Sequence, residues 1–192
     1  MKIEELFLFI KEIDLLKKVE RQALVHNGGR RENSAEHSWH LAVVALVLQS
    51  FAPKNIDINK AIKMAILHDI VEIYAGDTIV YGDLSGKEEA ELKAIERLSS
   101  LLPNEISSTF KETWLEFEKG ESIEAKYISA IDRFLPIFSN YLNEGHAWKN
   151  HNITLSKIIH KCEEPISSGL PELWELTKKL LQESVNKGDL NP

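Results

Sequence analysis

The chain is short of cysteine and of long apolar stretches, and both shortages limit where it can work. Its only cysteine among 192 residues is Cys162, so no internal disulfide can form. No run of about 18 apolar residues is present, which argues against a membrane-spanning helix. The first residues also lack the pattern of a secretory signal. We therefore expect a cytoplasmic protein without a membrane partner.

Basic residues are also fewer than acidic ones. The chain has 23 Lys and Arg against 30 Asp and Glu, which gives a formal net charge of −7. Proteins that cover duplex nucleic acid need a positively charged surface, so we expect no duplex nucleic acid partner. A small anionic substrate stays compatible with this composition, because a local arginine or metal cluster can outweigh an acidic surround.

The sequence contains few prolines and no convincing pair of strands. Most of its 6 prolines punctuate the ends of helical segments, and no internal repeat or low-complexity stretch stands out. Hydrophobic residues make up 43% and charged residues 28%, as in a folded globular protein. A chain of this length can bury one substantial core. We predict an all-α fold in a single domain, residues 1–192.

Helical periodicity of apolar residues covers most of the chain. Residues 3–18 should form a helix that packs on the core, and residues 19–32, with Gly28-Gly29, should form a loop. Asn33 can cap the next helix, with Glu36 completing a capping box. The following LAVVALVLQSF is apolar nearly all round and suits a central buried helix. Further helices are expected at about 61–74 (capped by Asp57 or Asn59), 87–102, 104–118, 121–143, 151–161 and 171–186, with a loop at 75–86 in which Asp83 is a turn residue.

The dipeptide His68-Asp69 is the most informative feature of the sequence. It interrupts the apolar run AIKMAILHDIVEIY, where a core-facing helix would place leucine. Glu72 follows one helical turn after His68, so two carboxylates and an imidazole cluster on one helix. An alternative places Asp69 and Glu72 on a solvated face paired with Lys63, but the surrounding residues are almost all apolar. Because unpaired buried carboxylates are costly, the cluster indicates a compensating cation.

Two other polar residues among apolar neighbours can complete a metal site. His37 lies in NSAEHSW, on the first turn of the helix that begins after Asn33, and Asp132 lies in SAIDRF. Together with the doublet they give two imidazoles and two carboxylates. Such a donor set suits a divalent transition metal.

These residues carry a resemblance to a known family. The order His37, His68-Asp69, Asp132 resembles the H…HD…D signature of the HD-domain metal-dependent phosphohydrolases over most of the chain. More narrowly, RRENSAEHSWHLA, AILHDIVEIYAGDT and AIDRF resemble the HD-domain 5′-deoxynucleotidases, whose motif runs E-x-x-x-E-H-S, L-H-D-x-x-E-x-x-x-G-D and D-[KR]. The resemblance implies an all-helical protein that releases phosphate from deoxyribonucleoside 5′-monophosphates, commonly as a homodimer.

The resemblance also assigns roles to particular residues. Glu72 matches the catalytic position, Asp77 the position that contacts the deoxyribose, and Arg21 a phosphate-binding position that Arg30 or Arg31 could fill instead. The implied ligands of one divalent metal, which could be Mn, Co, Fe, Ni, Zn or Mg, are His37, His68, Asp69 and Asp132.

The chemistry of these residues is coherent by itself. A metal makes a bound water acidic enough to attack phosphorus near neutral pH. Glu72 could orient or deprotonate that water, or protonate the leaving 5′-oxygen. Asp77 could accept a hydrogen bond from one sugar hydroxyl and crowd out a second.

Two other functions stay open at this point. The same metal centre could hydrolyse a nucleotide phosphodiester, a triphosphate or another small phosphate ester. Alternatively, the four ligands could hold a structural ion in a non-enzymatic regulatory module, although such an ion would not require Glu72 and Asp77.

Overall fold

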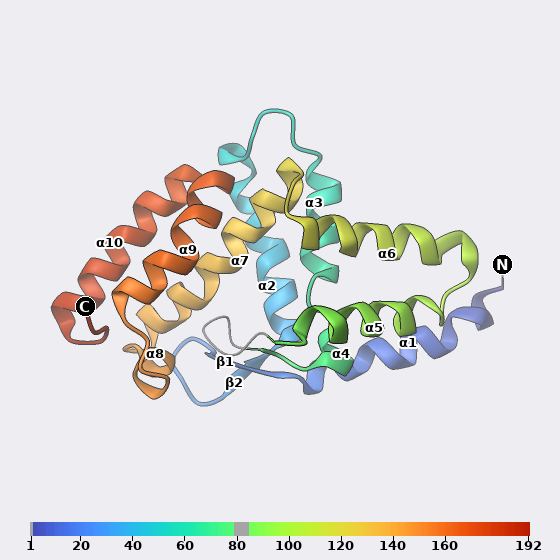
Figure 1. Ribbon diagram of the computed structural model, residues 1–192, viewed down its shortest axis with the longest axis horizontal. Helices are drawn as coiled ribbons and strands as arrows, with labels where there is room; N and C mark the ends of the chain where they lie inside the picture. The colour runs from blue at the N-terminus through green and yellow to red at the C-terminus, as the bar shows by residue number, and fades with distance from the viewer. Residues whose placement is uncertain (1, 79–84) are drawn as a thin grey trace.

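Helices α2 (Ser34–Val47), α3 (Ile58–Leu67) and α7 (Ile123–Leu142) form the centre of the computed structural model, which describes residues 2–78 and 85–192 (Figure 1). At one end α9 (Leu155–Gly169) and α10 (Pro171–Lys187) pack on α7. At the other end lie α1 (Phe7–Ile13), α5 (Lys87–Ser99) and α6 (Asn104–Lys119). The short elements are η1 (Ile3–Leu6), η2 (Asp14–Lys18), β1 (Glu20–Leu24), β2 (Arg31–Asn33), η3 (Leu48–Phe51), α4 (Glu72–Ala75) and α8 (His146–Asn150). The expected all-α class is confirmed.

Side-chain caps begin the central helices where the sequence predicts them. The Asn33 side chain accepts the backbone N–H of Glu36, whose carboxylate accepts the N–H of Asn33, so the capping box of α2 is complete. Of the two candidate caps for α3, Asp57 is the one used, and it accepts the N–H groups of Asn59 and Lys60. These caps satisfy backbone donors that have no partner inside the helix.

The central helices are held together by a buried core and by two specific contacts of α7. The hydroxyl of Tyr127 on α7 donates a 2.7 Å hydrogen bond to the carbonyl of Ala45 on α2. On the opposite side of α7, a Cβ added to Gly169 would stand 2.1 Å from the carbonyl oxygen of Lys126. Only glycine therefore allows α9 to approach α7 so closely. α7 is fixed between its neighbours, and with it Asp132.

The expected N-terminal segment packs partly on the core as predicted, but it is not one continuous helix. Residues 3–18 form a 3₁₀ turn, the helix α1 and a second 3₁₀ turn instead of one helix. A 3₁₀ turn has about three residues per turn, which shifts the apolar face expected at a 3.6-residue period. The apolar residues at that period are Ile3, Leu6, Phe7, Ile10, Ile13 and Leu16. Leu16 is buried, Leu6 and Ile13 are partly buried against the core, and Ile3, Phe7 and Ile10 are exposed.

Residues 19–32 form a β-hairpin rather than the expected loop. β1 and β2 pair antiparallel, with Glu20 opposite Asn33 and Leu24 opposite Arg31, and the register shifts between these pairs. Gly28-Gly29 lies in the connection, where both glycines have positive φ, so the turn was placed correctly. The prediction of no strand pair is wrong because both strands are short and mostly polar. They show no alternating pattern from which pairing could be inferred.

Two further expectations need correction. α9 extends from Leu155 to Gly169 instead of 151–161. Pro165 does not end the helix but lies inside it, as Pro136 lies inside α7. α2 is central but not fully buried, since Trp39, exposed at 67%, begins an apolar stripe that faces outward. Asp83 lies outside the described residues.

The predicted helices at 87–102, 104–118, 121–143 and 171–186 are found within a few residues of these limits, and the helix predicted after Asn33 begins at Ser34. In the described part of the chain, no helix combines the length and apolar character that crossing a membrane requires.

Candidate metal and phosphate site

His37 enters the site from the first turn of α2. The capping box at Asn33 and Glu36 fixes the start of this helix, and His37 follows directly. Its side chain is only 1% exposed, and its Nε2 lies 2.9 Å from Oδ1 of Asp132 on α7. The sequence prediction that places His37 on the first helical turn is confirmed, and the fold brings it to Asp132 as expected.

His68 and Asp69 lie just beyond the end of α3, not inside one continuous helix. α3 ends at Leu67, residues 68–71 form a turn, and α4 begins at Glu72, so the expected single helix at 61–74 is wrong. The carbonyl of His68, which would accept the N–H of Glu72 in an α-helix, accepts the indole N–H of Trp114 at 3.1 Å. The Glu72 N–H bonds the carbonyl of Asp69 instead. The doublet is thereby anchored from α6 as well as from α3.

The four predicted ligands meet in one buried cluster. Nε2 of His68 lies 3.1 Å from Oδ1 of Asp69 and 3.6 Å from Oδ1 of Asp132. One potential ligand atom from each of His37, His68 and Asp69 lies within 4.8 Å of the other two, a spacing that could hold a metal ion. Asp132 joins this group through its contacts with both imidazoles.

The orientation of the His68 ring tests whether a cation fits there. Nδ1 lies 2.9 Å from the carbonyl of Ala65, so it is the nitrogen that carries a proton toward the backbone. Nε2 is buried, and among the described residues it has no hydrogen-bond partner. Its lone pair faces two carboxylate oxygens, an arrangement that is repulsive unless a proton or a metal ion lies between them. The donor set therefore fits a cation.

The electrostatics of the metal-free cluster agree with this conclusion. Burial disfavours a charged His68 ring, but the carboxylates of Asp69 and Asp132 outweigh burial and raise the pKa of His68 to about 10. Burial pushes the pKa of each carboxyl upward. The imidazoles overcome this effect, with Arg21 also acting on Asp69, and hold both pKa values below their usual range. Both carboxyl groups therefore stay ionised, as ligands of a divalent cation must be.

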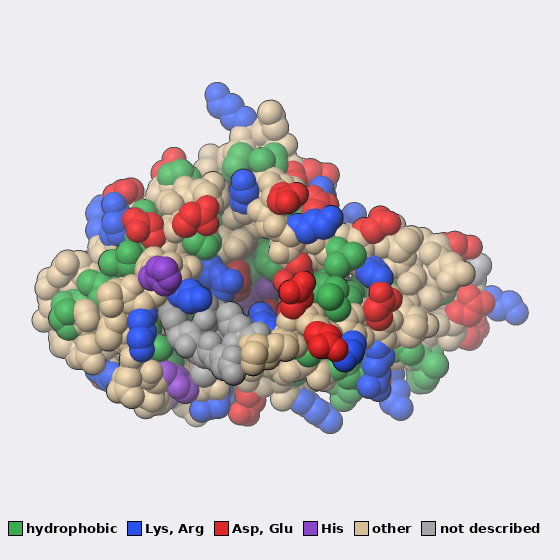
Figure 2. Space-filling view, viewed as in Figure 1, with side chains coloured by type: hydrophobic (Ala, Val, Ile, Leu, Met, Phe, Trp, Pro, Cys, Tyr) green, Lys and Arg blue, Asp and Glu red, His purple; other side chains and the backbone are tan. Residues whose placement is uncertain are grey.

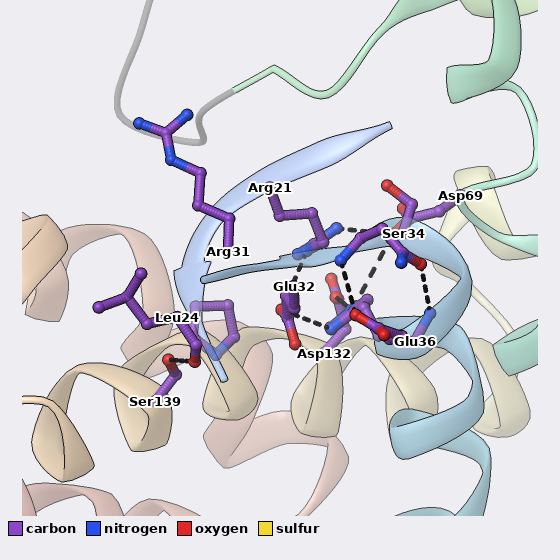
Figure 3. A network of polar contacts seen from close by, with 12 residues as sticks. Arg21, Leu24, Arg31, Glu32, Ser34, Glu36, Asp69, Asp132 and Ser139 are labelled. Atoms are coloured by element: carbon purple, nitrogen blue, oxygen red, sulfur yellow. Dashed lines mark hydrogen bonds and ion pairs between the residues drawn. The ribbon is translucent and has the colours of Figure 1, made fainter. Parts of the chain in front are cut away.

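Arg21 is the arginine that lies beside the cluster. It projects from β1 so that one terminal nitrogen, Nη1, donates a 2.6 Å hydrogen bond to Oδ2 of Asp69 (Figure 3). Arg30 instead pairs with Glu36 at the surface, and Arg31 extends from β2 away from Asp69 (Figure 3). Of the three candidates that the sequence left open, the geometry favours Arg21 for an anion bound next to the cluster.

Glu72 is the buried acid next to the doublet, at the start of α4. It is 7% exposed and accepts a 2.5 Å hydrogen bond from the hydroxyl of Ser34. Burial, followed by the charge of Asp69, raises the pKa of Glu72 to about 8, against the opposing effects of Arg21 and Ser34. A carboxyl group with this pKa can give or take a proton near neutral pH.

The cluster opens into a cavity of about 230 Å³, and acidic and basic side chains gather around a hollow in this face of the molecule (Figure 2). Asp77, two residues after α4, is half-buried in its wall, as the loop prediction requires. The fully buried His37 lies behind the cluster. The cavity is lined by Arg21, His68, Asp69, Glu72, Asp77, Thr78, Lys87, Glu91, Phe117, Glu118, Gly120, Ser129, Asp132, Arg133, Pro136 and Cys162.

Sequence reasoning gave no role to several residues that the fold brings here. Glu32 on β2 contacts both Arg21 and His37, and Arg133 adds a second arginine to the cavity wall. Ser34, the first residue of α2, donates to Glu72. Glu32 and Arg133 each lie within a quoted motif, as the first residue of E-x-x-x-E-H-S and the second of D-[KR], but their spacing alone gives no sign of these contacts.

Comparison with known proteins is consistent with the site. The family described as "HD domain" matches residues 13–174. Human 5′-deoxynucleotidase HDDC2 is 30% identical over 132 residues, or 67% of this chain and 63% of that protein. The protein of the same name from Xenopus laevis is 28% identical over 190 residues, which cover 94% of this chain and 88% of that protein. This chain thus spans less than two thirds of the length of the human relative.

A solved structure resembles almost the whole molecule. It is described as a predicted metal-dependent phosphohydrolase from Magnetospirillum magnetotacticum, and it is 39% identical with a TM-score of 0.94. The match covers 99% of this chain and 96% of that one. The similarity therefore includes the hairpin and the N-terminal segment as well as the helices that supply the cluster.

Proposed function

Because this chain belongs to the HD domain family, we propose that it is a metal-dependent phosphohydrolase that removes phosphate from deoxyribonucleoside 5′-monophosphates. One observation carries the proposal. Nε2 of His68, which has no hydrogen-bond partner in the described part of the chain, faces the carboxylates of Asp69 and Asp132. It lies at the inner end of a cavity that is also lined by Arg21 and Glu72. A cation site, an arginine and an acid with raised pKa are the groups that phosphate ester hydrolysis requires. The names of the curated relatives support this choice of substrate.

His37, His68, Asp69 and Asp132 are the proposed metal ligands. Two imidazoles and two carboxylates accept Mn, Co, Fe, Ni, Zn or Mg, and the donor set does not select one of them. A divalent ion bound here would lower the pKa of a water molecule and draw negative charge from a phosphoryl oxygen. The hydrogen bond from Nδ1 of His68 to Ala65 keeps Nε2 available as a ligand.

Glu72 is the proposed catalytic acid or base. It lies beside the doublet, and its contact with Ser34 fixes one carboxylate oxygen. In its charged form it can accept a proton from the attacking water, and in its neutral form it can donate one to the 5′-oxygen that leaves. Its raised pKa makes both forms accessible near neutral pH.

Arg21 and Asp77 are the proposed substrate contacts. Arg21 stands at the cluster with its guanidinium against Asp69, so its remaining N–H groups can hold the phosphate dianion. Asp77 lines the same cavity and can accept a hydrogen bond from a sugar hydroxyl. Its carboxylate also narrows the space beside that hydroxyl, which would disfavour ribose.

Replacing Asp69 by Ala tests the proposal as a whole. We expect the variant to lose both its divalent metal, measured by elemental analysis, and release of inorganic phosphate from paired ribo- and deoxyribonucleoside monophosphates. Asp14→Ala, at an exposed ion pair with Lys17, is the control and should keep both. Retained metal and unchanged turnover in Asp69→Ala would refute the assignment. Pyrophosphate as the product, or a nucleotide left after cleavage of a diester, would point to the other substrates.

We also propose that the protein is a homodimer joined through an outward stripe on α2. Trp39, Val43, Leu46 and Val47 lie on one helical face and are 67%, 39%, 52% and 72% exposed. An apolar patch of this kind is uncommon on a monomer and typical of an interface. The proposed cytoplasmic location and single domain, residues 1–192, are consistent with this assembly.

The dimer is tested by light scattering after size-exclusion chromatography. Val47→Glu should convert the dimer to a monomer, because it buries a charge in the interface. Ile66→Glu replaces an apolar residue on α3 that is 51% exposed, and it should leave the dimer intact. A wild-type protein that is monomeric at micromolar concentration would contradict the proposal.

A further inference from the structure

Glu32 on β2 connects two parts of the proposed site through a single carboxylate oxygen. Its Oε1 lies 3.3 Å from Nε of Arg21 on the paired strand and 3.6 Å from Nδ1 of His37 on α2. The Glu32 side chain is only 14% exposed, so these contacts are shielded from water. The hairpin and the core helices thus meet at this oxygen.

The two nitrogen atoms facing Glu32 lack other partners. Within the described part of the chain, Nε of Arg21 and Nδ1 of His37 are two of four buried side-chain atoms without a hydrogen-bond partner. Both can carry a hydrogen, and buried donors of this kind are nearly always satisfied. A shift of a few tenths of an ångström would bring Oε1 of Glu32 within hydrogen-bond distance of either nitrogen.

We propose that Glu32 is a positioning residue that orients His37 for the metal and Arg21 for the phosphate. By accepting the Nδ1 hydrogen of His37, Glu32 selects the tautomer whose Nε2 lone pair points at Asp132 and the metal cluster. By pairing with Nε of Arg21, it fixes the plane of the guanidinium, with Nη1 against Asp69 and the other terminal nitrogen available to an anion. This inference rests on the proposed function.

Because one oxygen of Glu32 contacts both Arg21 and His37, a structural role and a positioning role predict different effects of its replacement. If Glu32 acts only on folding, its replacement changes stability and leaves the affinities of the folded protein intact. If it positions both groups, replacement weakens binding of metal and of phosphate together. Outer partners of metal-binding histidines typically change metal affinity by about 10- to 100-fold when they are removed.

Two conservative variants of Glu32 separate the effect of side-chain length from the effect of charge. Glu32→Gln keeps the length of the side chain and an oxygen acceptor but loses the charge. Glu32→Asp keeps the charge but withdraws the oxygen by about one methylene, roughly 1.5 Å. Glu175→Gln is the matched control, because Glu175 is exposed and pairs with Lys178 on α10, away from the site.

The experiment titrates each metal-depleted protein with Mn²⁺ by calorimetry and then the Mn²⁺-loaded protein with inorganic phosphate. We expect Glu32→Asp to weaken Mn²⁺ binding by about 10- to 100-fold and Glu32→Gln to weaken it less, because the His37 tautomer needs the acceptor more than the charge. Phosphate binding should weaken in both variants. Glu175→Gln should match the wild type.

The outcomes are decisive for Glu32 whatever the substrate is. Wild-type affinities in both variants, or stronger Mn²⁺ binding by Glu32→Asp than by Glu32→Gln, would overturn the proposal. Thermal unfolding of the metal-free proteins checks that each variant is folded. If the wild type releases no phosphate from deoxynucleotides, the proposed function fails, while the two titrations still decide the role of Glu32.

Discussion

The helices that supply the metal cluster and the hairpin that lies beside it are built in different ways. The cluster residues come from α2, the end of α3 and α7, whose inner faces carry Leu41, Ala65 and Ile131 at 0% exposure. The hairpin contributes Arg21 from strands of five and three residues with a shifted register. The cluster is therefore part of the core, whereas Arg21 belongs to a small surface element.

This difference separates the two tasks of the proposed site. A metal needs several ligands held at fixed distances, and side chains locked by core packing provide that. A phosphate group is bound by charge and hydrogen bonds that tolerate some adjustment, which a surface hairpin can provide. Substitutions of the four proposed ligands or of Glu72 should therefore affect metal binding or the chemical step, and substitution of Arg21 should affect substrate affinity. Glu32 contacts both Arg21 and His37, so its substitution should affect both.

Glu72→Gln should have the largest effect, because it removes the proposed proton-transfer group on the core side. We expect kcat to fall by roughly 10²- to 10⁴-fold, with KM and bound metal little changed. Steady-state kinetics and elemental analysis measure these quantities. Glu124→Gln is the control, since Glu124 is equally buried but lies at the start of α7 next to Asp57 and Lys60. A Glu72→Gln enzyme with wild-type kcat would remove Glu72 from the mechanism.

Arg21→Ala should have the next largest effect and should act on the hairpin side alone. Losing a charge-assisted contact to phosphate should lower kcat/KM by roughly 10²-fold, mainly through KM, while the metal stays bound. Arg31 lies on the neighbouring strand and points away from Asp69, so Arg31→Ala should leave kcat/KM and bound metal unchanged (Figure 3). Metal loss in Arg21→Ala would break the distinction, since it would make Arg21 part of the metal site.

The core side was predictable from the sequence because its signals are local. An acid and a histidine inside an apolar run are visible without a structure, and so is the capping box that starts α2. The turn at 68–71 was missed because the donor that bonds the His68 carbonyl there is the indole of Trp114, 46 residues away. Pairing between residues distant in sequence leaves no periodic pattern in either segment.

The hairpin side was predictable only in part, for the same physical reason. The phosphate-binding role of Arg21 was inferred from the family resemblance, but the two strands that orient its side chain were predicted to be a loop. Glu32 stands in a charged RRE run, which ordinarily forms a solvated face, and only the paired strand makes it a neighbour of Arg21. Apolar periodicity likewise does not reveal which face of α2 remains uncovered.

Asp77→Ala should have the smallest effect and tests a residue that lies between the two sides. Asp77 follows α4 and lines the cavity together with Arg21, and burial raises the pKa of its carboxyl. If it accepts a hydrogen bond from the sugar and crowds the neighbouring position, its removal should reduce the preference for deoxyribose over ribose by about tenfold in kcat/KM. Asp77→Asn, which keeps the size and an oxygen acceptor, should retain most of the preference. A ratio that stays the same in Asp77→Ala would show that sugar selection lies elsewhere in the cavity, and a fall in bound metal would place Asp77 on the core side instead.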